Sequence, residues 1–363
     1  MPRLTPPHVE RLVPYVPGKP VEEVERELGI ADVVKLASNE SPFGPSPHAV
    51  EVLRRIVTDA HRYPDAAGYE LRHALAAFHG VKPDEIALGN GSNELINLLA
   101  LTFAGPDEHA VTGNPSFVCY RMALNAANVP LTEVALRDGL HWDVDSLLAA
   151  VRPDTKLLFV ANPNNPTGTY LARGELERLL RSLPPRVIAV LDEAYAQFAT
   201  AADFASALQL RATRERLVVL RTFSKAYGLA SLRVGYAVAP PKIVAYLDRV
   251  RAPFNVGGLA QAAARAALGD LEHVARTIEN NTRERERVTR ALEALGLRVA
   301  PSEANFVLVD VRTSGRAVYE RMLQRGVIVR PMPAPIETWL RITIGVRDEN
   351  DRMLATLREG VRT

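Results

Sequence analysis

The chain has few features that would support a disulfide scaffold, a thiolate metal site or a membrane span. Cys119 is the only cysteine, so neither an intrachain disulfide nor a zinc site built from several thiolates can form. No apolar run approaches the ~20 residues that a transmembrane helix needs. The N-terminal stretch has no apolar core followed by a small-residue cleavage site. We therefore expect a cytoplasmic protein that does not associate with membranes.

Neither sign of charge dominates the chain. Lys and Arg together number 44 and Asp and Glu 42, which leaves a net charge of +2 over 363 residues. The basic run RERER at 283–287 is typical of a solvated helix face, so we expect no nucleic-acid partner. The eight histidines show no metal-ligand spacing, and we expect no metal site.

The order of β-rich and helical segments predicts the architecture. The length suggests two or three domains. From about residue 45 to 250, short β-rich runs alternate with helical stretches, a pattern that predicts a largely parallel, doubly wound α/β sheet covered on both faces. The runs are EIALGN, HAVTG, LLFVAN, VIAVLDE, LVVLRTFS and RVGYAVA.

The rest of the chain predicts an N-terminal arm and a smaller C-terminal unit. The first residues are rich in proline and precede one amphipathic helix, VEEVERELGI. From about 255 a long helical run is followed by LRVAP, FVLVDV, GVIVRP and LRITIG, which are typical of strands in an α+β domain. We predict an arm over 1–40, a large domain over 41–255 and a small domain over 256–363.

Polar clusters follow several predicted strands directly. LLFVA leads into NPNNPTG at 162–168, VIAVL into DEAY at 192–195, and LVVLR into TFSKAYGLASLRVGY at 222–236. In an open α/β sheet, ligands bind outside the carboxyl ends of the strands. GNGSNE at 89–94 predicts a helix start whose free backbone N–H groups bind a phosphate, or a glycine turn with an ordinary cap. The pattern predicts one ligand-binding crevice.

Two charged residues in these clusters indicate the chemistry. Asp192 follows an apolar run, and a buried carboxylate needs a cationic partner because its desolvation alone is costly. A protonated pyridine nitrogen would serve, and so would a structural salt bridge. Lys225 follows another strand; a lysine of lowered pKa forms an imine with an aldehyde and then acts as a base, whereas most loop lysines are surface charges. We expect Lys225, Asp192, Asn165 and the turn at 91–93 to meet in the crevice.

NPNNPTG, DEAY and TFSKAYGLASLRVGY, in this order, resemble the signature blocks of fold-type I pyridoxal-phosphate aminotransferases, and the resemblance extends from roughly residue 30 to 350. It implies pyridoxal 5′-phosphate as the cofactor and a small-molecule amino donor and a 2-oxo acid as substrates. Lys225 would carry the cofactor as a Schiff base and act with Asp192 and Tyr195 in catalysis. Asp192 would pair with the pyridine nitrogen, while Asn165 and Tyr195 would hydrogen-bond the phenolic oxygen of the ring.

The resemblance also implies how the rest of the cofactor is held. Phe117 in NPSFVCY would stack on the pyridine ring, where many relatives have Tyr. Tyr63 in HRYPD would reach the cofactor phosphate of the other subunit, so the site would need a homodimer. The remaining cofactor-binding positions are Gly91, Ser92, Asn93, Thr222, Ser224 and Arg233.

Three further segments resemble the histidinol-phosphate aminotransferase subfamily: KLASNESPFGPSP at 35–47, HRYPD at 61–65 and GVIVRP…WLRITIG near the C-terminus. Relatives usually have NENPFGP and GSDE where this chain has NESPFGP and GSNE. Tyr15 on the arm would cover the substrate, which Asn39 and Asn165 would also contact. Arg341 would bind the carboxylate of glutamate, and Arg341 together with Arg330 would bind the phosphate of histidinol phosphate.

The resemblance thus implies amino transfer between L-histidinol phosphate and 2-oxoglutarate in histidine biosynthesis. An aromatic or broad-range aminotransferase is the nearest alternative, and a threonine-phosphate decarboxylase is a second. The alternative for Arg330 is that it forms an ion pair at the surface or at an interface and does not bind substrate. A non-catalytic cofactor-binding regulator is disfavoured, because it would be expected to add a DNA-binding domain and to have lost Lys225 or Asp192.

Overall fold

The computed structural model describes residues 3–361, so the outermost two residues of the predicted arm and of the predicted small domain lie outside the described range. The first half of the chain contains α1 Pro7–Glu10, α2 Val21–Leu28, β1 Val34–Lys35, α3 Pro47–Ile56, η1 Val57–His61, α4 Tyr69–His79, η2 Pro83–Glu85, β2 Ile86–Gly89, α5 Gly91–Phe103, β3 His109–Asn114, α6 Val118–Ala126, β4 Leu131–Ala135, α7 Val144–Ala149, β5 Thr155–Ala161 and α8 Arg173–Ser182.

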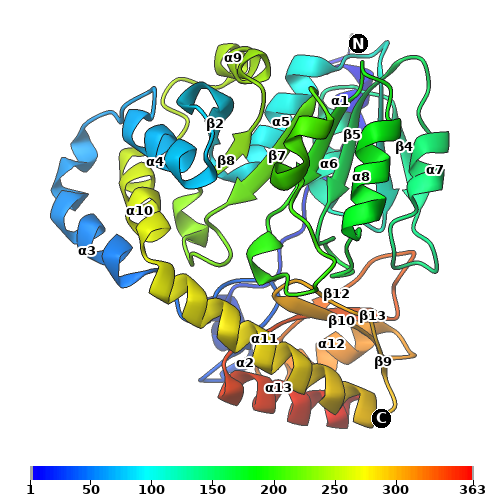
Figure 1. Ribbon diagram of the computed structural model, residues 1–363. Helices are drawn as coiled ribbons and strands as arrows, with labels where there is room; N and C mark the ends of the chain where they lie inside the picture. Colours follow the sequence, from blue (N-terminus) through cyan, green and yellow to red (C-terminus); the bar gives the residue numbers. More distant parts are fainter. Residues whose placement is uncertain (1–2, 362–363) are drawn as a thin grey trace.

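The second half contains β6 Ile188–Asp192, η3 Ala196–Phe198, η4 Ala207–Thr213, β7 Leu217–Thr222, η5 Ala230–Leu232, β8 Gly235–Val238, α9 Pro241–Val250, α10 Gly258–Gly269, α11 Leu271–Ala294, β9 Arg298–Val299, β10 Phe306–Asp310, α12 Gly315–Leu323, β11 Val327–Ile328, β12 Arg330–Pro331, β13 Trp339–Thr343 and α13 Arg347–Gly360. Figure 1 shows a large upper unit around one sheet and a smaller lower unit around a second sheet.

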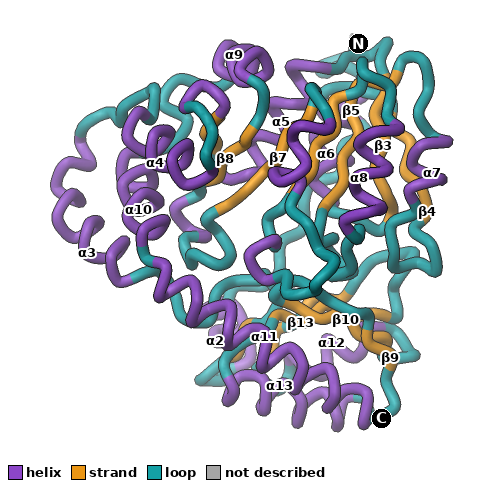
Figure 2. Tube along the Cα trace, viewed as in Figure 1, coloured by secondary structure: helices purple, strands orange, loops and turns teal. Residues whose placement is uncertain are grey.

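A seven-stranded sheet organises the large unit, with the strand order β2-β8-β7-β6-β5-β3-β4. Strand β8 pairs antiparallel with β2 and β7, and the pairs from β7 to β4 are parallel. The central strands β5, β6 and β7 are almost continuously apolar and buried, as expected where helices cover both faces of a parallel sheet. Helices flank the orange strands of this sheet in Figure 2. The predicted doubly wound, mostly parallel fold is confirmed.

The helices that cover the sheet have amphipathic sequences. In α8 the buried residues are Leu176, Leu179 and Leu180, spaced three and four apart, whereas the arginines and glutamates of RGELERLLRS lie on the other side. Helix α5 contacts α6 and α9, and α8 contacts α7 and η4. These helices and the strands share one apolar core that includes Leu99, Phe159 and Leu191.

The C-terminal part forms the smaller α+β unit. Its four-stranded antiparallel sheet has the order β12-β13-β10-β9, and helices α11, α12 and α13 pack around it. The N-terminal segment belongs to this unit as well: β1 pairs in parallel with β11, and Val24 of α2 is buried in the same core.

Two details differ from the prediction. Strand β4, with the sequence LTEVA, was not predicted; it lies at the edge of the large sheet, where all five residues are partly exposed. The helical run after 255 is two helices, because the chain breaks at Asp270, whose side chain accepts a hydrogen bond from His273 N–H and caps α11. Figure 1 shows α11 running from the α3–α4–α10 group to the lower unit.

The packing of α10 bears on the domain boundary. Helix α10 contacts α3 and α4, and its Ala263 and Ala264 lie in one core with Leu71 of α4 and Tyr236 of β8. We therefore propose that the large domain extends to Asp270 rather than to residue 255, and that α11 begins the small domain. None of the described helices combines the length and the apolar composition required to cross a membrane.

Candidate active site

A cavity of about 310 Å³ opens at the carboxyl ends of three parallel strands. Ala161, Asp192 and Thr222, the last residues of β5, β6 and β7, line it. The start of α5 supplies Ser92 and Asn93 on one side. The opposite wall comes from the N-terminal segment and from the small sheet. The pocket therefore lies between the two units, at the place where open α/β sheets bind ligands.

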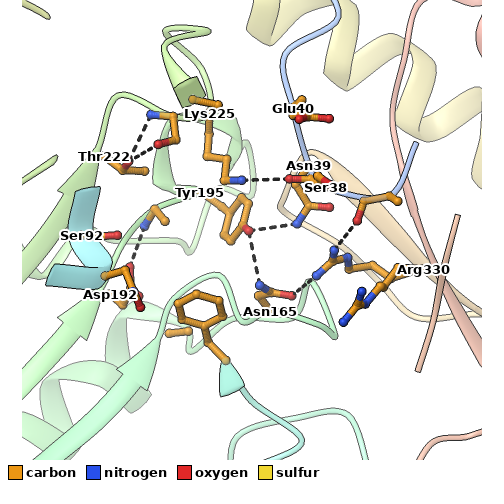
Figure 3. A pocket seen from close by; sticks show the side chains of 18 of the residues that line it. Ser38, Asn39, Glu40, Ser92, Asn165, Asp192, Tyr195, Thr222, Lys225 and Arg330 are labelled. Carbon is orange, nitrogen blue, oxygen red and sulfur yellow. Dashed lines mark hydrogen bonds between the residues drawn. The ribbon is translucent and has the colours of Figure 1, made fainter. Parts of the chain in front are cut away.

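Most of the predicted site residues meet in this pocket. Those that line it are Tyr15, Asn39, Ser92, Asn93, Phe117, Asn165, Asp192, Tyr195, Thr222, Ser224, Lys225, Arg233, Arg330 and Arg341. Gly91 and Tyr63 are not among the lining residues. Figure 3 shows Lys225 and Tyr195 extending from the strand ends toward Ser38 and Asn39 of the N-terminal segment.

Lys225 lies in the loop after β7, and its ammonium nitrogen is held at the centre of the pocket. Nζ donates a hydrogen bond to the carbonyl oxygen of Ser38 at 3.1 Å. Burial lowers the pKa of Lys225 to about 8, and the positive charge of Arg341 adds to the shift. A lysine in this state loses its proton near neutral pH and becomes a nucleophile and a base.

Asp192 ends strand β6 and is 4% exposed. Its Oδ2 accepts a hydrogen bond from the Tyr120 hydroxyl at 2.9 Å, and its Oδ1 accepts one from Ala194 N–H at 3.2 Å. Burial raises the pKa of Asp192 to about 6, although both hydrogen bonds favour the ionised form. A cation bound in the pocket would find a desolvated carboxylate already oriented toward it.

Tyr195 brings the N-terminal segment and the large sheet together. Its hydroxyl accepts hydrogen bonds from Asn39 Nδ2 at 2.9 Å and from Asn165 Nδ2 at 3.4 Å. Burial raises the pKa of Tyr195, whereas Arg341 and the bond from Asn39 oppose that rise. The three side chains form a group of hydrogen-bond donors and acceptors beside Lys225, visible in Figure 3.

Arg233, Ser224 and the first turn of α5 form a site for an anion. Arg233 Nη1 donates to Ser224 Oγ at 3.3 Å, and its guanidinium lies so close to Gly91 that a Cβ there would collide with it. Gly91 has a φ of 72°, and Arg233 also adopts a left-handed φ of 52°. The guanidinium, a hydroxyl and the N-terminus of a 13-residue helix therefore converge on one corner of the pocket, as phosphate recognition requires.

Arg330 and Arg341 bring two positive charges to the other end. Strands β12 and β13 pair antiparallel with Arg330 directly opposite Arg341. Arg341 donates to Asn165 Oδ1 and to the Ala37 carbonyl, both at 2.6 Å, while its buried Nε has no hydrogen-bond partner among the described residues. Arg330 donates to the Val16 carbonyl at 3.0 Å. An unpaired buried donor beside a second guanidinium favours an anionic ligand.

Tyr63 lies outside this pocket. It is 83% exposed and stacks on Phe254, with 4.7 Å between the ring centroids. Its predicted role requires a second copy of the chain, so it stays a prediction.

The family model for class I and II aminotransferases matches residues 31–357. The chain belongs to this family. Within it, a histidinol-phosphate aminotransferase of Anaeromyxobacter sp. (strain Fw109-5) is 48% identical over 98% of each chain. A histidinol-phosphate aminotransferase of Moorella thermoacetica is 47% identical over 95% of this chain and 90% of its own length.

Solved structures of the same family have the same fold. The crystal structure of histidinol-phosphate aminotransferase from Sinorhizobium meliloti, in complex with pyridoxal-5′-phosphate, superposes with a TM-score of 0.91 at 30% identity. It covers 100% of this chain and 98% of its own. The aminotransferase resemblance inferred from the sequence blocks is therefore confirmed, whereas the roles of individual site residues stay predictions.

Sequence reasoning missed Tyr120 and Ser38. Tyr120 follows Phe117, the residue before α6, by three residues in NPSFVCY, and this spacing of about one helical turn brings the two rings into contact. That spacing is the signal that could have found it. Ser38 contributes a backbone carbonyl, and no residue type is required for such a contact, so the sequence carries no signal for it.

Proposed function

We propose that the chain transfers an amino group between L-histidinol phosphate and 2-oxoglutarate, giving imidazole-acetol phosphate and glutamate in histidine biosynthesis. The observation that carries the substrate assignment is the Arg330–Arg341 pair across β12 and β13. One arginine suffices for a carboxylate, whereas a phosphate dianion favours two. The histidinol-phosphate aminotransferases that are similar over nearly the whole chain support the same substrate.

Pyridoxal 5′-phosphate fits the pocket by the chemistry of its residues. The corner formed by Arg233, Ser224 and the α5 N-terminus would hold the phosphate, and Asp192 would face the ring nitrogen. Phe117 lines the pocket where the ring would stack, and Asn165 and Tyr195 would hydrogen-bond the phenolic oxygen. When bound, the cofactor supplies an aldehyde carbon that takes the amino group and a ring that withdraws electrons from the substrate carbon.

The side chains of this protein would bind, orient and move protons. Lys225 Nζ would hold the cofactor and then carry a proton to and from the substrate carbon, which its lowered pKa permits near neutral pH. The Asp192 carboxylate would keep a proton on the ring nitrogen. Arg341 would orient the carboxylate of glutamate, and with Arg330 the phosphate of histidinol phosphate.

A homodimer is part of this proposal. Tyr63 and Phe254 form an exposed aromatic pair, with 83% and 41% of their surfaces accessible, and exposed aromatic rings are typical of protein interfaces. Tyr63 would reach the cofactor phosphate of the partner. We also propose a cytoplasmic location, in accord with a role in amino-acid biosynthesis. Sedimentation of wild type and Tyr63→Phe, combined with cofactor titration, tests the dimer and the role of the hydroxyl separately.

The activity is tested by mixing cofactor-loaded protein with L-histidinol phosphate, L-glutamate, L-phenylalanine and O-phospho-L-threonine in turn. Histidinol phosphate and glutamate should bleach the visible absorbance of the bound cofactor efficiently, and phenylalanine should do so poorly. A preference for phenylalanine would instead identify an aromatic aminotransferase, and release of carbon dioxide from phosphothreonine a decarboxylase. Lys225→Ala is the control; a wild-type chain without a visible band, indistinguishable from Lys225→Ala, refutes the proposal.

A further inference from the structure

Tyr120 lies behind the pocket, on the first turn of α6, and is completely buried. Its ring stacks on Phe159 of β5, with centroids 5.1 Å apart and an interplanar angle of 20°. It also meets Phe117 edge-on at 5.6 Å. Phenylalanine at position 120 would preserve these ring contacts, so packing alone does not require the hydroxyl group.

The hydroxyl of Tyr120 donates its hydrogen bond to a carboxylate. Oδ2 of Asp192 accepts it at 2.9 Å, and Oδ1 is held by Ala194 N–H. The carboxylate is therefore fixed at both oxygens, from the helix on one side and from its own loop on the other. Rotation of Asp192 away from the pocket would break a buried hydrogen bond, which is costly.

The bond also acts on the charge of Asp192. Burial, with the neighbouring Asp192 charge, raises the pKa of Tyr120 well above its ordinary value, so the phenol stays a donor throughout the working pH range. A donor favours the ionised carboxylate over the protonated one, and so opposes the effect of burial on Asp192.

We propose that Tyr120 is a positioning residue that holds Asp192 oriented and ionised for a cationic partner in the pocket. The inference rests on the proposed function, in which that partner is the protonated ring nitrogen of pyridoxal phosphate. Tyr120 touches neither the pocket nor the reacting atoms and acts through Asp192.

Tyr120→Phe tests this inference because it removes only the hydroxyl. One charge-assisted hydrogen bond corresponds to about a tenfold change in equilibrium, and hence to a pKa of Asp192 about one unit higher. The acid limb of the pH profile for pyridoxal phosphate binding to the apoprotein should therefore move up by about one unit. At pH 5, where loss of the bond lowers the ionised fraction of Asp192 about ninefold, pyridoxal phosphate should bind about ninefold more weakly. An analogue with C–H at the ring-nitrogen position should bind within about twofold of wild type, because it needs no anion.

The apoprotein gives a readout that needs no cofactor. Because the folded-state pKa of Asp192 is raised to about 6, its ionisation destabilises the fold as pH rises through that value. Tyr120→Phe raises the pKa further. The factor by which this substitution increases the unfolding equilibrium constant should therefore be about fivefold larger at pH 7 than at pH 5. The groups that interact with Asp192 are Tyr120, Cys119, Glu193, Tyr195 and Lys225.

Tyr236→Phe is the matched control. Tyr236 is 1% exposed, lies on β8 and hydrogen-bonds His79 Nε2 at 2.7 Å, so this variant also loses a buried phenolic hydroxyl, but not one bound to Asp192. It should leave the acid limb at its wild-type position. Any change in affinity should be the same for pyridoxal phosphate and for the C–H analogue. Replacing Tyr120 by 4-aminophenylalanine, which keeps a donor at the same position, should restore the wild-type profile and serves if Tyr120→Phe does not fold.

Three outcomes would overturn the inference: an unchanged acid limb, equal weakening of both cofactors, or a stability loss that does not depend on pH. Any of them would leave Tyr120 with a purely structural role. Failure of the proposed function would look different, because wild type itself would then bind neither cofactor. The pH dependence of apoprotein stability would still decide whether Tyr120 controls the ionisation of Asp192.

Discussion

Arg330→Met should separate the two substrates of the proposed reaction. Arg330 lies opposite Arg341 across the β12–β13 pair, and the proposal assigns it to the substrate phosphate but not to the glutamate carboxylate. A hydrogen bond to a charged group contributes about 1.5–3 kcal/mol. Because Arg330 is only half-buried, solvent screening favours the lower figure, which corresponds to about tenfold in rate.

The measurement is the rate of each half-reaction in single-turnover mixing, followed by the visible absorbance of the bound cofactor. The second-order rate constant should fall about tenfold or more with histidinol phosphate, whereas with glutamate it should change less than about threefold. Arg330 also holds the Val16 carbonyl, and a looser N-terminal segment would slow both donors alike. The ratio between the donors is therefore the decisive quantity.

Arg298→Met is the matched control for that ratio. Arg298 lies on β9 of the same sheet, and its guanidinium covers the ring of Trp339 at 5.4 Å much as Arg330 covers Tyr15 at 5.9 Å. It is exposed and does not line the pocket, so both half-reactions should proceed at the wild-type rate. A fall with glutamate as large as the fall with histidinol phosphate would refute the assignment of Arg330.

Three further substitutions test the lysine, the anion corner and the core. Because the pKa of Lys225 is lowered to about 8, its ammonium form destabilises the fold below that pH; Lys225→Met should raise the melting temperature of the apoprotein at pH 7, and the gain should shrink as pH rises toward 10.5. Gly91→Ala places a Cβ against the Arg233 guanidinium at a left-handed φ and should weaken pyridoxal phosphate binding tenfold or more, measured by titration. Arg214→Lys removes a guanidinium that donates to four backbone carbonyl oxygens and should lower the free energy of unfolding in urea by about 2–4 kcal/mol.

Each of these has a control of the same residue type. Lys242 is exposed on α9, and Lys242→Met should show no gain that depends on pH. Gly174 on α8 has open space around it, so Gly174→Ala should leave cofactor binding unchanged. Arg216→Lys, at an exposed arginine with one carbonyl contact, should cost well under 1 kcal/mol. A control that behaves like its test variant would contradict the corresponding structural reason.

The large sheet could be predicted because its central strands are apolar throughout. LLFVA and VIAVL have no second interpretation once helical segments alternate with them. The edge strand β4 was missed because LTEVA mixes apolar and polar residues, and a half-exposed edge does not require an apolar run. The break between α10 and α11 was missed because the apolar periodicity continues on both sides of Asp270, although a Gly followed by an Asp cap was readable.

The pocket could be predicted as far as its residues follow strands. Asn165 and Lys225 follow β5 and β7, Asp192 ends β6 between them, and the carboxyl ends of parallel strands share one edge of the sheet. The bond between Tyr120 and Asp192 depends instead on how α6 packs against β5, which no local pattern specifies. Tyr63 lies beyond both kinds of reasoning, because its predicted partner atoms belong to another copy of the chain.

The short strand β1 explains why the pocket needs both ends of the sequence. Its parallel pairing with β11 fixes the chain up to residue 35, and Leu36 then exchanges hydrogen bonds with Ile328 and Thr343.

Asn39 follows at once and donates its backbone N–H to Thr343 Oγ1, so its side chain is aimed at Tyr195 from the small sheet. Arg341, two residues before Thr343 on β13, reaches Asn165 from the same side. The large sheet alone would therefore present Lys225, Asp192, Tyr195 and Asn165, but without Asn39 and Arg341. The bond from Asn39 to Tyr195 and the bond from Arg341 to the Ala37 carbonyl both depend on the pairing of the N-terminal segment with the small unit.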